Sequence, residues 1–148
     1  MKNMLPEAPV PIGNYVTSKK IGDLIYTSGH IPITAEFKND YIGKVGKDIT
    51  TEKAYEASKL VCDLTISTII NMGIDINLLT PINVIGYVNA IDSFEEHPKV
   101  LNGFTDQLIE YIQESTVPTR SAVGVSSLPN NVCVEIQSIF KINKSNES

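Results

Sequence analysis

The spacing of hydrophobic positions predicts two amphipathic helices in the middle of the chain. The first helix is expected to begin after Thr50 or Thr51, because either hydroxyl can cap a helix start, and to run to about Met72. Gly73 can end it. Apolar residues recur at helical spacing along this segment, at Ala54, Ala57, Leu60, Val61 and Leu64.

The second helix is predicted to follow residues 93–96 (SFEE), which match a capping box. Pro98 suits the first helical turn, where a missing backbone N–H costs nothing. One face of this helix is apolar and is formed by Leu101, Phe104, Leu108 and Ile112. Both helices should therefore bury one side.

Alternating and β-branched segments predict at least five strands around these helices. Residues 15–27 predict a hairpin, residues 83–92 an interior strand, and residues 121–127 with 132–142 a final hairpin. Residues 34–48 predict a surface loop that contains a short strand near Tyr41. The element order β-β-α-β-α-β-β favours an α+β fold with one mixed sheet and both helices on one face.

Length and composition predict one soluble, cytoplasmic domain over residues 1–148, with a disordered polar tail at about 144–148. The chain is 42% hydrophobic and 20% charged, as in ordinary globular proteins. Its formal net charge is −5 without a basic cluster, which disfavours nucleic acid as a partner. No apolar segment predicts a membrane span or a signal peptide.

Neither the cysteines nor the histidines predict a metal site. Cys62 and Cys133 lie in apolar segments without metal-ligand spacing, so two buried thiols are favoured and a disulfide is the alternative. His97 is expected to be exposed at a helix start. His30 ends a strand, where it either lines a pocket or is held by structural hydrogen bonds.

Two isolated charges, Arg120 and Glu135, stand on strands of otherwise small or apolar residues. An unpaired buried charge is costly, so each requires a partner or a function. If the last two strands form a hairpin that turns near Pro129, Glu135 lies opposite Gly124 and shares one face with Arg120.

That arrangement has two interpretations. Arg120 and Glu135 form a salt bridge or point into water, or they bracket a small-molecule pocket floored by Ala122 and Gly124. In a pocket, the arginine can bind a substrate carboxylate with two parallel hydrogen bonds. The glutamate can orient and deprotonate a water molecule, which would suit hydrolysis of a small carboxylated molecule.

Five segments together resemble the RidA/YjgF family of imine deaminases, over roughly residues 6–142. They are residues 11–16 (PIGNYV), 25–32 (IYTSGHIP), 102–104 (NGF), 118–123 (PTRSAV) and 128–136 (LPNNVCVEI). The resemblance implies a chorismate mutase-like α+β fold that assembles as a homotrimer with clefts between subunits. Such an assembly would cover the partly apolar second face of the last strand.

The resemblance also implies an activity, the hydrolysis of 2-imino or enamine acids such as 2-iminobutanoate and 2-iminopropanoate to 2-keto acids and ammonia. Arg120 would bind the substrate carboxylate, and Glu135 would hold the attacking water. The remaining residues that match the family's pocket are Tyr15, Ser28, Gly29, Asn102 and Ala122. No cofactor or metal is implied, because an imine carbon is already electrophilic. Tyr15 taken alone is equally compatible with a core aromatic residue.

The chain departs from short family members at two positions. His30 stands where they usually have glutamine, and Ala122 where many have cysteine. Residues 97–103 (HPKVLNG) and 120–125 (RSAVGV) resemble a longer branch of the family.

The alternative function is a non-catalytic trimer that binds a small carboxylate. A third reading, as endoribonuclease or translation inhibitor, is disfavoured by the acidic charge.

Overall fold

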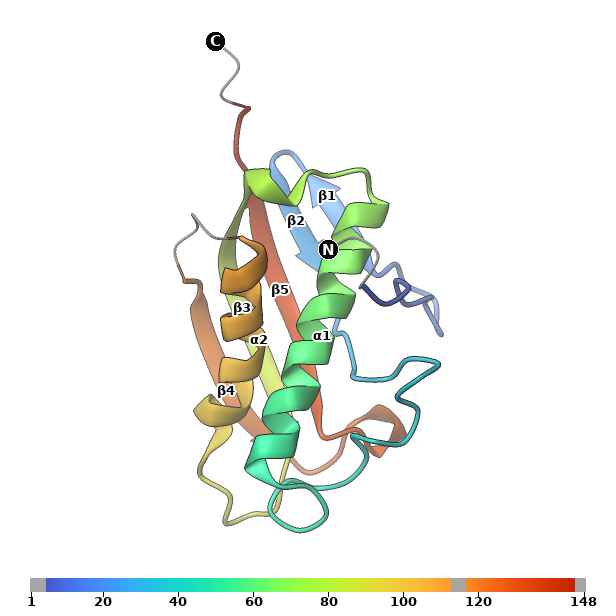
Figure 1. Cartoon of the computed structure of the whole chain (residues 1–148), viewed down its shortest axis with the longest axis vertical. Coiled ribbons are helices and arrows are strands. Elements are labelled where there is room, and N and C mark those ends of the chain that lie inside the picture. Colours follow the sequence, from blue (N-terminus) through green and yellow to red (C-terminus); the bar gives the residue numbers. More distant parts are fainter. Residues whose placement is uncertain (1–4, 113–116, 146–148) are drawn as a thin grey trace.

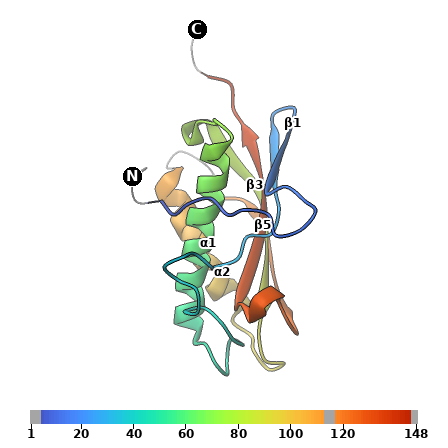
Figure 2. The same cartoon turned by 90° about the vertical axis from the view of Figure 1, so that its right-hand side faces the viewer.

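The computed structural model describes residues 5–112 and 117–145 (Figure 1). A five-stranded mixed sheet with the strand order β1-β2-β5-β3-β4 carries both long helices on one face (Figure 2). The strands are β1 (Ser18–Ile21), β2 (Leu24–Thr27), β3 (Leu79–Asn89), β4 (Thr119–Val125) and β5 (Val134–Ile142). The helices are α1 (Thr51–Asn71) and α2 (His97–Tyr111), with short 3-10 turns η2 (Ile76–Leu78) and η3 (Pro129–Asn131). The predicted α+β class is confirmed.

Helix α1 begins and ends as the sequence predicts. The Thr50 hydroxyl accepts a hydrogen bond from the Lys53 backbone N–H at 3.1 Å, which satisfies one free donor of the first turn. Met72 is the C-cap, and Gly73 follows with a φ of +80°, a left-handed conformation that glycine adopts at little cost.

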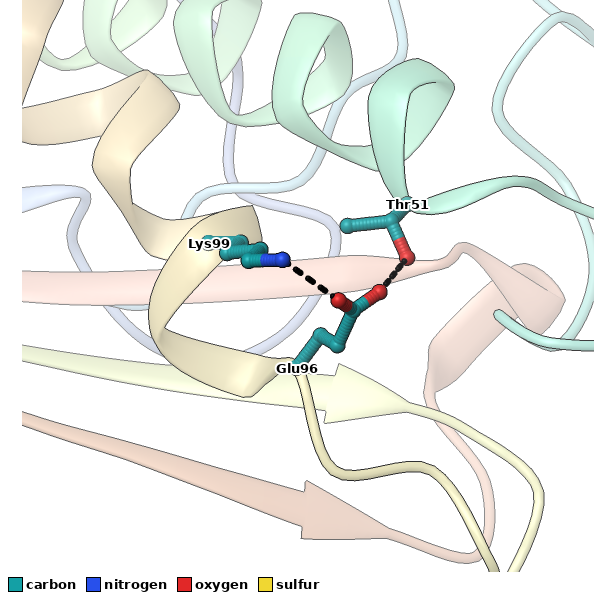
Figure 3. A network of polar contacts seen from close by, with 3 residues as sticks. All are labelled: Thr51, Glu96 and Lys99. Atoms are coloured by element: carbon teal, nitrogen blue, oxygen red, sulfur yellow. Dashed lines mark hydrogen bonds and ion pairs between the residues drawn. The ribbon is translucent and has the colours of Figure 1, made fainter.

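Helix α2 lacks the predicted capping box, because its N-cap is Glu96 and no side chain caps it. Glu96 instead accepts hydrogen bonds from the Thr51 hydroxyl at 2.9 Å and from Lys99 Nζ at 2.6 Å (Figure 3). This carboxylate therefore joins the starts of the two helices. Farther along, Gly103 packs so closely on the Tyr55 carbonyl that a Cβ there would overlap it.

The first predicted hairpin is confirmed with a shorter first strand, since β1 pairs antiparallel with β2 and Tyr15 lies in the loop before it. The short strand expected near Tyr41 is reduced to isolated bridges, such as Ile42 with Val132. Of the polar tail predicted at about 144–148, the first two residues have no regular structure and the rest lie outside the described residues.

The predicted final hairpin is wrong, because β3 lies between β4 and β5. Strand β3 pairs in parallel with β4 and antiparallel with β5. The connection between β4 and β5 therefore crosses the end of β3. Asn130 and Asn131 in this connection have φ values of 58° and 55°.

The two faces of the sheet differ as the alternation in β5 predicts. Val134, Ile136 and Phe140 are buried beneath the helices. On the opposite face, Tyr26 and Val123 are large hydrophobic residues exposed to solvent. Neither helix covers this open face (Figure 2). Within residues 5–112 and 117–145, helices with the length and apolar character to cross a membrane are absent.

Candidate functional site

Glu135 lies on the open face of the sheet, next to Gly29. Its register partner in β3 is Tyr87 rather than the predicted Gly124. A Cβ atom on Gly29 would overlap the Glu135 carboxylate and lie 2.8 Å from its Cδ, so a side chain at position 29 would force this carboxylate to move. In the described part of the chain, the carboxylate has no hydrogen-bond or ion-pair partner, and burial raises the pKa of Glu135.

Ser28 fixes the loop that carries Tyr15. Its hydroxyl donates a hydrogen bond to the Val16 carbonyl at 2.6 Å, and its backbone N–H donates to the Thr17 carbonyl at 2.9 Å. Tyr15 is 47% exposed and is not a core aromatic residue. It lines, together with Gly29, a hollow of about 470 Å³. Three predicted pocket residues thus belong to one part of the chain, and one of them, Gly29, touches Glu135.

His30 is a buried structural residue in this fold. Its Nδ1 lies 2.8 Å from the Ser28 carbonyl, which can only accept, so Nδ1 carries the proton. Its Nε2 then accepts from the Thr68 hydroxyl at 2.8 Å. Burial lowers the pKa of His30 and keeps the ring neutral. Of its two sequence interpretations, the hydrogen-bonded one is confirmed, although the residue also lines the hollow.

Arg120 lies on the opposite face of the sheet from Glu135, so the prediction of a shared face is wrong. It occupies the same row as Val84, which is buried beneath the helices. Glu135 pairs with Tyr87, which is three residues beyond Val84 along β3. Because successive side chains of a strand alternate between the two faces, Tyr87 and Val84 lie on opposite faces. The intervening strand changes the register that a direct hairpin would have produced.

Helix α2 holds the Arg120 guanidinium. Nη1 donates to Asn102 Oδ1 at 2.9 Å and to Thr105 Oγ1 at 3.2 Å, and Nη2 donates to the Pro98 carbonyl at 3.4 Å. A salt bridge between Arg120 and Glu135 is therefore absent. Ala122, the next residue on this face of β4, is half-buried. The structure thus brings Arg120, Asn102 and Ala122 together, away from Glu135.

Two features near β4 were not expected. His97 is half-buried rather than exposed, since its ring contacts Phe94 edge-on at 5.0 Å and its Nε2 lies 2.6 Å from the place of a Cβ on Gly124. The buried Asn89 accepts from Lys44 Nζ at 3.0 Å and donates to Asn131 Oδ1 at 3.1 Å. An asparagine at the end of a largely apolar strand was the available signal for this network.

The cysteines are free and buried, as favoured over a disulfide. Burial raises the pKa of Cys133 to about 12, so its thiol stays protonated near neutral pH. Across the described ranges, histidine, cysteine and acidic side chains form no cluster of three or more that could hold a metal ion.

The sequence model of the family described as endoribonuclease L-PSP matches residues 5–142. The chain therefore belongs to this family, which is the RidA/YjgF family that its motifs resemble. Two relatives are named 2-iminobutanoate/2-iminopropanoate deaminase. The one from Dermatophagoides farinae is 29% identical over 137 residues, covering 93% of this chain and 92% of the relative. The one from Escherichia coli K12 is 31% identical over 139 residues, covering 89% and 90%.

Solved structures agree with this assignment. The protein Atu1372 from Agrobacterium tumefaciens, described as of unknown function, has 30% sequence identity and a TM-score of 0.84. The match covers 94% of this chain and 86% of that one. The YjgF gene product of Escherichia coli, with 23% sequence identity, has a TM-score of 0.66, so the fold is that of the RidA/YjgF family. Within it, one copy of this chain carries two separate chemical groups, an arginine held by α2 and a half-buried carboxylate beside Gly29.

Proposed function

We propose that this protein hydrolyses 2-imino or enamine acids to 2-keto acids and ammonia without a cofactor. The observation that carries the proposal is Glu135, a half-buried acid with a raised pKa and no bonded partner in the described chain. An acid of this kind can take a proton from water and return it. The names of the two relatives support the same reaction class.

Arg120 is the proposed anchor for the substrate carboxylate. Its bonds to α2 use both Nη1 protons and one Nη2 proton. Nε–H and the second Nη2–H make no hydrogen bond in the described chain, and a guanidinium can offer Nε–H and an Nη2–H as parallel donors to the two oxygens of a carboxylate. Asn102 and Thr105 thus hold the guanidinium from one edge and leave the other for the substrate.

The reaction then needs only water and Glu135. Glu135 takes one proton as the water oxygen bonds to the imine carbon, and the C=N electron pair moves to nitrogen. Glu135 passes that proton to nitrogen. The second water proton follows as the C–N bond breaks, which releases ammonia and leaves the 2-keto acid. The raised pKa of Glu135 favours both accepting and returning a proton.

A site that uses both residues requires two copies of the chain, and we propose the homotrimer with intersubunit clefts. The opposite faces of Arg120 and Glu135 support this, because one sheet separates them. The exposed hydrophobic residues Tyr26 and Val123 on the open face support it as well, since association would cover them. In this arrangement, Arg120 of one copy meets Glu135 of the next.

A coupled assay tests the proposed activity. A threonine dehydratase generates 2-iminobutanoate in the presence of an amine trap, and keto acid formation is followed with and without the protein. We expect faster keto acid formation with the wild type and none above background with Arg120→Ala or Glu135→Gln. Size-exclusion chromatography with light scattering checks that the variants keep the wild-type assembly. Equal rates for wild type and variants would contradict the proposal.

A carboxylate-binding protein without turnover is the second candidate. Arg120 favours it, since its anchoring contacts are complete within one chain and do not involve Glu135. Under this function, short 2-keto acids would raise the Tm of wild type and Glu135→Gln but not of Arg120→Ala, and no variant would alter imine hydrolysis. Endoribonuclease action, as in the family description, fits poorly with a formal net charge of −5.

A further inference from the structure

The hollow beside Gly29 is large and mainly apolar. Its volume of about 470 Å³ lies within the range of small-molecule sites. Apolar residues from the chain segments before β1 and after β2 line it, namely Pro9, Val10, Ile12, Ile31, Ile33 and Ala35. Lys38 is the one charged residue among its described lining. A methyl or ethyl group would leave most of this space unfilled.

The hollow adjoins the place proposed for the reaction through one residue, Gly29. Gly29 lines it and also touches the Glu135 carboxylate. Tyr15 lines it from the loop that Ser28 fixes. A substrate whose imine carbon lies near Glu135 can therefore extend its side chain past Gly29 into the hollow.

Apolar side chains in the wall of the hollow are exposed to solvent, and an apolar ligand would bury them. Val10 is 79% exposed and Ile12 is 80% exposed, although both line a concave surface. Burying such side chains against an apolar group is favourable in proportion to the area removed from water. An acidic side chain would find only Lys38 to pair with and would leave the apolar wall unused.

We propose that the hollow binds the side chain of the substrate and that the preferred substrates are 2-imino acids with branched aliphatic or aromatic side chains. This inference rests on the proposed deaminase function. It names a substrate class with larger side chains than 2-iminobutanoate or 2-iminopropanoate. Shape and apolar contact supply the selectivity, and Arg120 supplies the common carboxylate anchor.

Isothermal titration with stable 2-keto acid products tests the inference on the full-length assembled protein. The series is pyruvate, 2-oxobutanoate, 4-methyl-2-oxopentanoate, phenylpyruvate and 2-oxoglutarate. We expect 4-methyl-2-oxopentanoate to bind about tenfold more tightly than pyruvate, or better, because three more carbons become buried. Ala35→Phe places a bulky side chain in the hollow and should remove this advantage of 4-methyl-2-oxopentanoate over pyruvate. Ile109→Phe, an exposed position on α2, is the control and should bind as wild type.

The outcomes separate this inference from the proposed function. Equal affinities across the series, with binding lost in Arg120→Ala, would overturn the side-chain preference and leave the deaminase proposal intact. An advantage that survives Ala35→Phe would also overturn it. Tightest binding of 2-oxoglutarate, lost in Lys38→Met, would show an acidic substrate instead. Absence of any Arg120-dependent binding would contradict both proposals.

Discussion

Asn102 Oδ1 lies 2.9 Å from Arg120 Nη1, so a residue of α2 orients the guanidinium of an edge strand. Asn102→Ala should weaken 2-keto acid binding about 3- to 10-fold, because Thr105 and the Pro98 carbonyl still hold Arg120. Arg120→Ala should cost about 10- to 100-fold, since it removes the charged donors themselves. Titration calorimetry measures both. Glu110→Ala on the exposed side of α2 is the control, and a loss for Asn102→Ala no larger than the control's would contradict the positioning role.

A side chain at position 29 should impair catalysis because of the contact between Gly29 and Glu135. Gly29→Ala would displace the Glu135 carboxylate, so kcat should fall about 100-fold or more, as for loss of a general base. Binding of a 2-keto acid through Arg120 should change little. Glu135→Gln, which keeps the shape but not the base, is the matched comparison. A Gly29→Ala variant with wild-type kcat would show that the position of this carboxylate does not matter.

The pH dependence of the rate should report Glu135. Burial raises the pKa of this carboxyl above that of an ordinary glutamate, and the base must be ionised to take a proton from water. Activity should therefore decline as the pH falls through a pKa above about 4.3, the usual value for glutamate. The residual rate of Glu135→Gln should lack this acidic limb. An unchanged limb in that variant would assign the titration to another group.

His30 should make the protein less stable in mild acid. Its pKa is lowered in the folded protein, so the unfolded chain binds a proton at a higher pH than the native state does. The contribution of His30 to the free energy of unfolding should be constant above about pH 6.5 and should decrease below it. Urea unfolding at several pH values measures the slope. His30→Gln should show a smaller decrease than wild type, and an identical decrease would contradict a neutral buried His30.

Local patterns predicted the helices, whereas the sheet order depends on contacts far apart in the sequence. The apolar spacing and the Thr50 cap defined α1 within one segment of chain. No local signal distinguishes a hairpin of β4 and β5 from two strands separated by β3, because the alternation along a strand does not specify which strand lies beside it. This error placed Arg120 and Glu135 on one face.

The residues of the candidate site stay a prediction, whereas the structure corrects the geometry expected for Arg120 and Glu135. The family motifs identified Arg120 and Glu135, although spacing alone allowed a simple salt bridge between them. The structural role of His30 follows from its hydrogen bond with Thr68 on α1, a contact that the sequence does not indicate. The hollow beside Gly29 depends in the same way on the path of residues 9–12, a proline-rich segment with no regular structure.

Mixing two inactive variants tests the central claim that Arg120 and Glu135 of different copies share one site. Arg120→Ala and Glu135→Gln are denatured, combined in equal amounts and refolded together, and imine hydrolysis is compared with that of each variant refolded alone. Random assembly should restore about one site in four, since such a site takes Arg120 from one variant and Glu135 from the other. We predict recovery of about a quarter of wild-type activity. A mixture as inactive as either variant, with mixed assemblies verified by mass spectrometry, would contradict a shared site.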